Sequence, residues 1–143
     1  MIRKIRPEDA PAVIQMLEDF YTSDAVSTNG SPEIYAANVK NCLGDCPYVE
    51  GYVFCEGDTL QGYSMVATGY CTEFGKPCIW VEDLYIRPQF RGKGIATDYF
   101  SFLRETFPDR VIRLEAEPDN EKAIALYKRC GFGTLPYLQL IIK

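Results

Sequence analysis

The sequence predicts one α/β domain, residues 1–143, built on a mixed central sheet with helices on both faces. Three observations lead to this fold class. The length of 143 residues suits one domain. Strand-like and helix-like apolar periodicities alternate in the order β-α-α-β-β-β-α-β-α-β. The early strands are joined by short turns, whereas a later strand-helix-strand unit requires its two strands to run parallel.

The N-terminal part predicts one strand and two helices. Residues 2–6 alternate between apolar and charged side chains, which indicates a short strand. Proline and two acids open a helix predicted over residues 7–21. A polar, glycine-containing loop is expected over residues 23–30. Serine, proline and glutamate then start a second helix over residues 31–43.

The middle of the chain predicts three consecutive strands. Residues 48–56 and 60–73 are rich in Val, Tyr and Thr, and Glu56-Gly57-Asp58 between them is typical of a hairpin turn. After a turn over residues 74–77, residues 78–86 form an apolar run that two acids interrupt. We therefore expect an antiparallel meander here.

The C-terminal part predicts helix, strand, helix and strand. An apolar face with helical spacing covers residues 94–107, and residues 111–117 alternate as a strand does. A helix over residues 120–130 ends at Gly131, which suits a left-handed cap. Residues 137–142 predict a last strand with an apolar edge, which we expect to be covered within the fold or by a second copy in a homodimer.

Composition excludes several classes of function. Lys and Arg total 15 against 20 Asp and Glu, a net charge of −5, so no nucleic-acid partner is expected. No apolar run approaches the roughly 18 residues of a membrane span, and no apolar segment follows the basic N-terminus. We expect neither a membrane partner nor a secretory signal. The chain has no His, which excludes Ser-His and Cys-His nucleophiles.

The six cysteines bear on compartment and metal binding. Cys42 and Cys46 are spaced CxxxC, but no second pair repeats the spacing and no His could complete a zinc site. Without an export signal, reduced thiols in the cytoplasm are the favoured interpretation. We expect no metal.

Residues 81–96 carry the most informative pattern, a strand that passes through a glycine-containing turn into a helix. Gly92 and Gly94 allow a ligand close to the backbone. Free N–H groups at a helix start suit a phosphate, and Arg87, Arg91 and Lys93 add positive charge. The segment therefore predicts a phosphate-binding turn.

Two nucleotide-binding patterns compete with this interpretation. Nothing matches a Walker loop. A dinucleotide fingerprint needs Gly or Ala where Thr97 stands, although Glu115 and Glu117 lie at a suitable distance downstream. Only 46 residues follow Thr97, too few for a doubly wound fold that normally begins with this unit. A dinucleotide-binding fragment is the weakest alternative.

Two patterns carry a resemblance to a known family. Gln89-Phe90-Arg91-Gly92-Lys93-Gly94 fits the form (Arg/Gln)-x-x-Gly-x-(Gly/Ala). Asn120 before a helix, Tyr127 on it and Gly131-Phe132 after it form the second. Together they resemble the GNAT acetyltransferases, the acyl-CoA N-acyltransferase superfamily. Residues 81–86 are also similar to its polyamine or diamine branch.

The resemblance implies a reaction and a set of roles. An amine would attack acetyl-CoA directly, with the pyrophosphate on backbone N–H groups of residues 91–96 and the pantetheine arm paired with Leu84 and Ile86 in a splayed gap. An N–H near Leu84 would stabilise the oxyanion, Asn120 would hold the arm and Tyr127 would protonate the thiolate. The implied cofactor-binding residues are Leu84, Tyr85, Ile86, Gln89, Phe90, Arg91, Gly92, Lys93, Gly94, Ile95, Ala96, Asn120, Ala123 and Tyr127.

The residues themselves leave structural alternatives open. Asn120 and Tyr127 are seven residues apart, about two helical turns, so both project to one face. Asn120 could equally be a helix N-cap, and Tyr127 a core aromatic residue. Arg91 and Lys93 could be solvated surface charges.

Glu82 and Asp83 are the candidates for a base. An amine with a pKa of about 10.4 is mostly protonated at neutral pH, so a carboxylate or a water must accept its proton. Strand neighbours point to opposite faces, so only one of the two acids can face the site. Position in the polyamine-like branch favours Glu82. Asp83 could instead be a structural acceptor at a bulge, or both acids could attract a cationic amine.

The predicted function is transfer of an acetyl group to a primary amine of a small molecule, polyamine-like or aminoglycoside-like, or of a peptide. A protein N-terminal or lysine acetyltransferase and a non-catalytic acyl-CoA-binding or sensor module are the alternatives. The acceptor pocket is expected from residues 21–35 and 70–77. Its aromatic residues either line that pocket or pack in the core: Tyr21, Tyr35, Tyr70 and Phe74.

Overall fold

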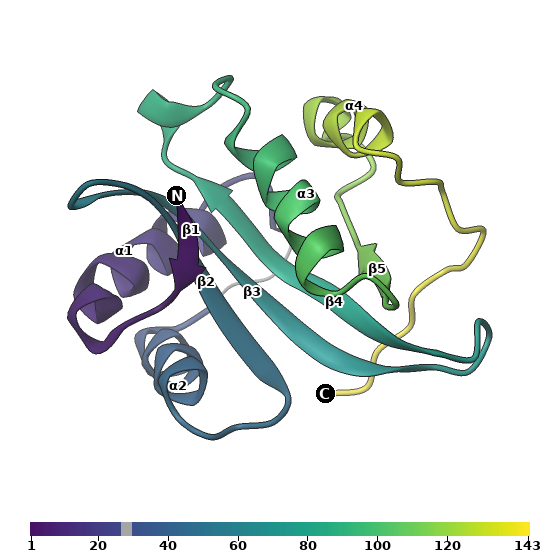
Figure 1. Ribbon diagram of the computed structural model, residues 1–143, viewed down its shortest axis with the longest axis horizontal. Helices are drawn as coiled ribbons and strands as arrows, with labels where there is room; N and C mark the ends of the chain where they lie inside the picture. Colours follow the sequence, from purple (N-terminus) through teal and green to yellow (C-terminus); the bar gives the residue numbers. More distant parts are fainter. Residues whose placement is uncertain (27–29) are drawn as a thin grey trace.

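The computed structural model describes residues 1–26 and 30–143. Its centre is a five-stranded sheet with strand order β1-β2-β3-β4-β5 (Figure 1). Neighbouring strands are antiparallel except β4 and β5, which are parallel. The mixed sheet confirms the predicted fold class. The strands are β1 (Ile2–Lys4), β2 (Val49–Glu56), β3 (Thr59–Cys71), β4 (Lys76–Ile86) and β5 (Val111–Leu114).

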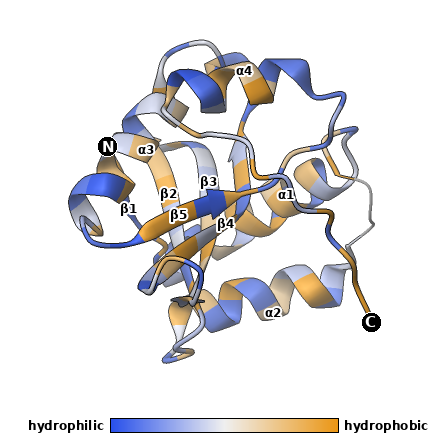
Figure 2. Cartoon of the chain, turned by 90° about the vertical axis from the view of Figure 1, so that its right-hand side faces the viewer, coloured by the Kyte–Doolittle hydropathy of each residue, from blue (hydrophilic) through white to orange (hydrophobic). Residues whose placement is uncertain are grey.

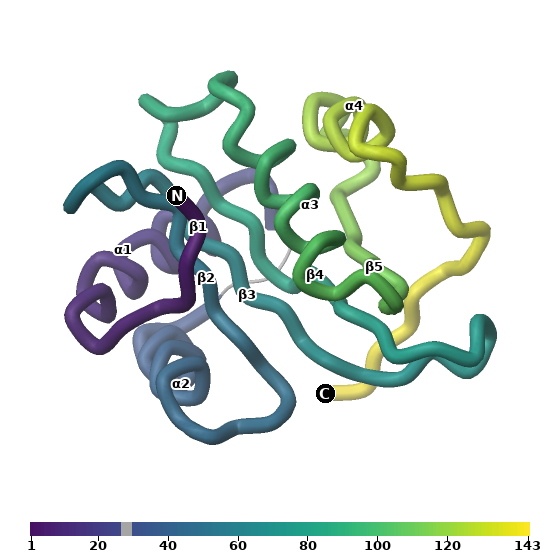
Figure 3. The backbone as a smooth tube through the Cα atoms, viewed as in Figure 1, coloured from purple at the N-terminus to yellow at the C-terminus, as the bar shows by residue number. Residues whose placement is uncertain are grey.

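Helices cover both faces of the sheet, as predicted. Helices α1 and α2 share one buried cluster with the sheet, and α3 and the end of α4 share a second cluster on the opposite face. The path of the backbone between the helices and the sheet can be followed in Figure 3. The helices are α1 (Ala10–Tyr21), α2 (Pro32–Leu43), α3 (Ile95–Thr106) and α4 (Glu121–Arg129), with 3-10 turns η1 (Pro7–Asp9) and η2 (Pro88–Phe90).

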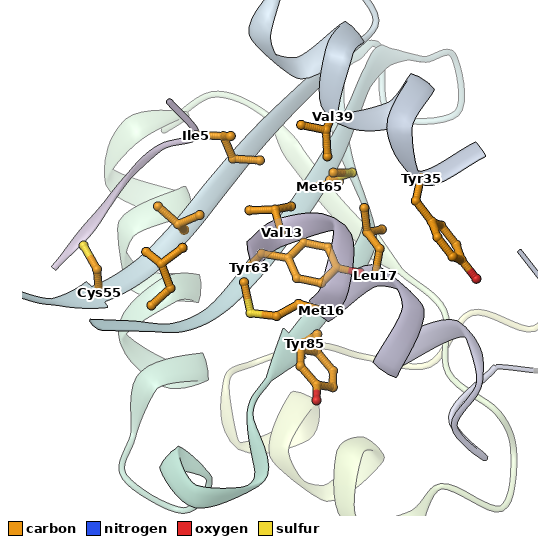
Figure 4. Close-up of a cluster of buried hydrophobic side chains, with 12 residues drawn as sticks. Ile5, Val13, Met16, Leu17, Tyr35, Val39, Cys55, Tyr63, Met65 and Tyr85 are labelled. Atoms are coloured by element: carbon orange, nitrogen blue, oxygen red, sulfur yellow. The ribbon is translucent and has the colours of Figure 1, made fainter. Parts of the chain in front are cut away.

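The first cluster fixes α1 on β3. Val13, Met16 and Leu17 are fully buried and follow helical spacing. They pack around Tyr63 and Met65 of β3, as the close-up shows (Figure 4). Each buried aliphatic side chain contributes about 1.5–3 kcal/mol. The last turn of α1, where Tyr21 lies, is thereby held against the sheet.

The second cluster fixes α3. It thereby also fixes the turn before α3 that contains Gly92 and Gly94, which we call the glycine turn. Tyr99, Phe100 and Leu103 are essentially inaccessible to solvent. They pack on Phe54 and its neighbours, with the ring centroids of Tyr99 and Phe54 5.0 Å apart. In Figure 2 hydrophobic and hydrophilic residues alternate along α2 and α4.

Local details match the sequence at the helix starts, with one difference. The Ser31 hydroxyl accepts a hydrogen bond from the Ile34 N–H at 3.3 Å, a helix cap. The α1 helix, predicted from residue 7, begins at Ala10, because residues 7–9 form a 3-10 turn. The predicted loop over 23–30 includes residues 27–29, which lie outside the described residues.

The C-terminal segment differs from prediction. The strand expected over 111–117 ends at Leu114. The strand expected over 137–142 is not formed, and its apolar side chains are not covered within the fold: exposure is 86% at Leu138, 88% at Leu140 and 100% at Ile142. Alternation gives strand propensity, but a strand needs a partner edge, and none is supplied to these residues. We call residues 136–143 the tail.

No helix in the described part of the chain has the length and apolar character needed to cross a membrane.

Candidate active site

The site begins where β4 and β5 separate. The two strands pair from Cys78–Val111 to Val81–Leu114, yet β4 continues to Ile86. Along residues 83–86 its other edge stays paired with β3. One edge of β4 is therefore open over these residues. This is the splayed gap that an added extended ligand requires.

A β-bulge lies at the start of the open edge. Met65 of β3 faces Asp83, and Val66 faces Val81, so Glu82 is the extra residue. The buried Ser64 hydroxyl donates to the Asp83 carbonyl at 2.6 Å and holds the irregularity in place. Bulges bend a strand and re-aim its side chains, and they are frequent beside active sites.

Asp83 is turned toward α1 and is 2% exposed. Its carboxylate accepts hydrogen bonds from the Tyr21 hydroxyl at 2.7 Å and the Tyr63 hydroxyl at 3.4 Å. Burial raises the pKa of Asp83 to about 6, against the lowering effect of these two bonds. The geometry agrees with a buried acceptor at the bulge, one of the two interpretations of Asp83 that the sequence left open.

Glu82 is exposed at the open edge. Partial burial raises the pKa of its carboxyl, and the charges of Asp83 and Glu115 raise it further. A carboxylate with a raised pKa that solvent can reach suits a general base better than an ordinary one. The two acids thus occupy different environments, as their positions on one strand predicted.

The glycine turn follows β4 directly. Gly92 and Gly94 have φ of +75° and +84°, and a Cβ on either would meet nothing within 4 Å. Gly94 is the N-cap of α3, whose hydrogen-bond ladder starts with the Asp98 N–H donating to the Gly94 carbonyl at 3.0 Å. N–H groups before Asp98 precede the ladder and point out of the helix end. This geometry suits the backbone N–H groups of the turn to an anion, as the sequence predicts.

The prediction that free N–H groups begin at Arg91 needs one correction. The Arg91 N–H donates to the Pro88 carbonyl at 3.2 Å and closes the 3-10 turn. Its side chain is also engaged, since Nε donates to the Ile86 carbonyl at 2.8 Å and the guanidinium lies 5.7 Å from the Tyr85 ring centroid. Arg91 ties the turn to the end of β4. The Lys93 ammonium lies over the Phe90 ring at 5.3 Å.

Three of the residues predicted to contact the ligand lie at the start of α4 and along it: Asn120, Ala123 and Tyr127. The Asn120 side chain accepts a hydrogen bond from the Ala123 N–H at 3.3 Å, so Asn120 is a helix cap. The Tyr127 ring packs edge-on against Phe100 and Phe132, at centroid distances of 5.8 and 6.0 Å. Burial raises the pKa of the Tyr127 hydroxyl, with a smaller contribution from Cys130. Its hydroxyl therefore keeps its proton at neutral pH.

The four aromatic residues expected around the acceptor separate into two groups. Tyr35 is 4% exposed and belongs to the core, and Tyr21 is held by Asp83. Tyr70 and Phe74 are exposed near the β3–β4 turn. Part of the expected acceptor segment, residues 27–29, lies outside the described residues.

Sequence reasoning missed the network around Asp83. Ser64 and Tyr63 come from β3, and Tyr21 lies 62 residues before Asp83. The register between β3 and β4 brings Tyr63 and Ser64 to Asp83, and the packing of α1 on the sheet brings Tyr21. The single usable signal in the sequence was a pair of acids in an otherwise apolar strand. Within the described residues, no group of three or more His, Cys, Asp or Glu is arranged to hold a metal ion.

Comparison with known proteins bears on this geometry. The model of the family described as Acetyltransferase (GNAT) family matches residues 11–132. Over 136 residues, the chain is 30% identical to a thialysine N-epsilon-acetyltransferase from Caenorhabditis elegans, which covers 92% of this chain and 81% of that protein.

Two solved structures illustrate the likeness in fold. A possible acetyltransferase from Clostridium difficile 630 has a TM-score of 0.85 at 18% identity, covering 100% of this chain and 96% of that one. AAC(6')-Iy, in complex with the bisubstrate analogue CoA-S-monomethyl-acetylneamine, has a TM-score of 0.81 at 13% identity, covering 100% and 97%. At these identities the structures support the fold alone.

Proposed function

Since the chain belongs to the GNAT acetyltransferase family and is an acetyl-CoA-dependent N-acetyltransferase, we propose an acceptor for the acetyl group. The acceptor is the primary amine of a small, cationic molecule, polyamine-like or aminoglycoside-like. One observation carries the proposal: the open β4 edge starts at an acid, Glu82, and leads to the glycine turn before α3. The curated relative named for thialysine and the aminoglycoside enzyme of similar fold support a small amine.

The residues at the site fit acetyl-CoA. A Cβ on Gly92 or Gly94 would fill the space in front of the turn, where a pyrophosphate would lie against the backbone. The open edge offers backbone amide and carbonyl groups to the pantetheine arm, which contains amides of its own, and the Ile86 carbonyl on this edge already accepts a hydrogen bond from Arg91. When bound, acetyl-CoA supplies an activated thioester. The chain itself supplies binding, orientation and proton transfer.

Two side chains would handle the protons. Glu82 would accept the proton of the attacking ammonium at a carboxylate oxygen, directly or through a water. The Tyr127 hydroxyl, held by Phe100 and Phe132, would donate its proton to the leaving sulfur. Negative charge at Glu82, Asp83 and Glu115 supports attraction of a cationic acceptor.

Several further properties are part of the proposal. Residues 1–143 would act as one domain in the cytoplasm, which the six free thiols support. The assembly would be a homodimer, for which the exposed tail is the main support. We propose no metal, nucleic-acid or membrane partner.

A substrate panel tests the proposal. Purified protein with acetyl-CoA would be mixed with diamines and polyamines, thialysine, aminoglycosides, amino acids and peptides, and release of CoA thiol would be followed. We expect turnover with small polycationic amines, a large loss in Glu82→Gln, and unchanged turnover in Glu105→Gln, an exposed acid at the far end of α3. Turnover restricted to peptides would indicate a protein acetyltransferase. Acetyl-CoA binding without turnover on any amine would indicate a binding module.

A further inference from the structure

A cavity near the start of β5 gathers positive charge. Its volume is about 400 Å³, and three of its lining residues are arginines from α3, from the loop after it and from β5: Arg104, Arg110 and Arg113. None of the described residues that line it is an acid. The chain as a whole carries a net charge of −5, so its composition alone does not account for a basic cavity.

These arginines have no carboxylate partner of their own. Among the residues that the structure describes, no ion pair includes any of them. Two acids on neighbouring elements are already engaged. Glu50, which lies within reach of the charge of Arg110, is paired with Lys4 at 3.2 Å. Glu73 accepts a hydrogen bond from the Tyr137 hydroxyl at 2.9 Å. The positive charge of the cavity is therefore left to solvent or to a ligand.

Ring stacking holds two of the three guanidinium groups in place. Arg113 lies over Trp80, its partner across the β4–β5 pair, at 5.0 Å from the ring centroid. Arg110 lies over the Phe107 ring at 4.9 Å. Groups held in this way lose less freedom when a ligand binds, and their planar N–H edges match the oxygens of a carboxylate or a phosphate.

One donor at the cavity is buried without an acceptor. Nε of Arg113 has no hydrogen-bond partner among the described residues. A buried donor of this kind is costly, and an ion or ligand that the structure does not contain is one of its ordinary explanations. Arg104, in contrast, donates one of its five N–H groups to the Cys130 carbonyl. The unpartnered donor is an observation independent of the charge of the cavity.

The cavity lies away from the glycine turn. Arg104 is in the last turn of α3, ten residues after Gly94, which corresponds to about 15 Å along the helix axis. The lining residues Val111 and Ile112 belong to the part of β5 that is paired with β4, whereas the open edge of β4 begins beyond the pair that includes Leu114. An anion in the cavity is therefore not the pyrophosphate expected at the glycine turn.

Size and lining indicate an organic anion rather than a single inorganic ion. A volume of about 400 Å³ lies in the range of about 300–1,000 Å³ that is typical of small-molecule sites. Phe74, Phe132 and Leu135 give the cavity an apolar wall beside the arginines. The combination fits a molecule with an apolar body and an anionic group.

We propose that this cavity binds a small organic anion, with an apolar body and at least two negative charges on phosphate or carboxylate oxygens, at a site separate from that of acetyl-CoA. Arg104, Arg110 and Arg113 bind the oxyanion, and the apolar wall holds the body. The inference does not rest on the function proposed above, because none of the three arginines has a role in acetyl transfer.

Calorimetric titration with defined probes tests the proposal without a catalytic assay. The probes are phenyl phosphate, phthalate, inorganic phosphate and the neutral benzyl alcohol, at an ionic strength of about 0.15 M. We expect phenyl phosphate or phthalate to bind at one molecule per chain, and the tighter of the two identifies the anionic group as phosphate or carboxylate. Inorganic phosphate and benzyl alcohol should bind more weakly. Trp80 is the chain's single Trp and lies against Arg113, so its fluorescence should change with binding.

Variants locate the bound probe. Arg113→Gln and Arg110→Gln should each weaken binding by about tenfold or more, because a charge-assisted hydrogen bond is lost. The matched control is Arg129→Gln, which removes the same charge from an exposed position in the last turn of α4 and should bind normally. Leu135→Glu keeps all three arginines but brings a carboxylate to the cavity, so it should abolish binding. Gly94→Val and saturating CoA should leave binding of the probe unchanged.

A single cooperative melt in each variant establishes that it is folded. The proposal is overturned if neither dianion binds, if benzyl alcohol or inorganic phosphate binds as tightly, or if the folded arginine and Leu135→Glu variants bind like the wild type. Displacement by CoA, or loss of binding in Gly94→Val, would also overturn it, because the probe would then occupy the glycine turn. A chain that binds the dianion in the cavity but turns over no amine would refute the proposed function alone.

Discussion

Replacing Asp83 by Asn should make stability less sensitive to pH, and the structure gives the size of the effect. Asp83 is 2% exposed, and burial moves its pKa from an ordinary value of 3.8 to about 6. At 1.36 kcal/mol per pKa unit, this difference corresponds to about 3 kcal/mol. The ionised carboxylate therefore costs the folded state about 3 kcal/mol once it is fully charged.

The sign follows from proton linkage. Because the folded pKa lies above the unfolded one, the folded state binds the proton more tightly. The contribution of Asp83 to stability is thus most favourable at low pH and declines as pH rises through about 4 to 6. The Asn side chain keeps the shape and can still accept the hydrogen bond from Tyr21, but it carries no charge. The free energy of unfolding of Asp83→Asn relative to the wild type should therefore rise by about 3 kcal/mol as pH increases from about 4 to above 6.

Urea unfolding at a series of pH values from about 4 to about 7.5 measures this difference. The matched control is Asp58→Asn, which removes an exposed carboxylate in the β2–β3 turn and should show no such trend. A difference between Asp83→Asn and wild type that stays constant over the whole pH range would refute the reasoning. Burial would then not oppose the charged form at this position.

Four further changes probe the site and the fold. Glu82→Gln should lower kcat/KM most near neutral pH and recover in part at high pH, where the amine loses its proton unaided; a larger loss in Asp83→Asn would transfer the role of base to Asp83. Tyr127→Phe should leave acetyl-CoA affinity unchanged in calorimetry and lower kcat about 10²-fold, whereas weak binding with intact turnover would make it a packing residue. Gly94→Val places a β-branched residue at φ +84° and fills the open space in front of the glycine turn. The rise in Tm on adding acetyl-CoA should therefore vanish, and a normal rise would rule out this turn as the binding site of the pyrophosphate. Ser31→Ala deletes a helix cap and should cost about 1 kcal/mol, and an unchanged urea midpoint would show that the cap contributes nothing.

The sequence predicted the local structure well because its signals are local. Ser31 caps a helix, Gly131 takes a positive φ of +94°, and the glycines at 92 and 94 form the expected turn. Each of these depends on the conformational preference of one residue and its near neighbours. The four helices and the β2–β3–β4 meander follow from periodicity in the same way.

The parts that could not be predicted depend on contacts distant in sequence. The bulge at Glu82 arises from the register between β3 and β4, and no periodicity within β4 encodes it. Tyr21 reaches Asp83 only because α1 packs across the sheet. The prediction of a strand over residues 137–142 was wrong although the apolar pattern is typical of one. A strand also needs an edge to pair with, and residues 137–142 do not themselves specify that edge.

The open edge of β4 has a consequence for solubility. Backbone amide and carbonyl groups along residues 82–86, except the Ile86 carbonyl that Arg91 Nε contacts, are a template on which an unfolded chain could start to aggregate. Charged residues stand at both ends of this template, Glu82 at its start and Arg87 just beyond its end, as gatekeepers do around aggregation-prone strands. A ligand arm lying on the edge would block it entirely. A concentrated solution of the protein should therefore stay free of aggregates for longer with CoA than without it. Neutralising both Glu82 and Arg87 should shorten that time.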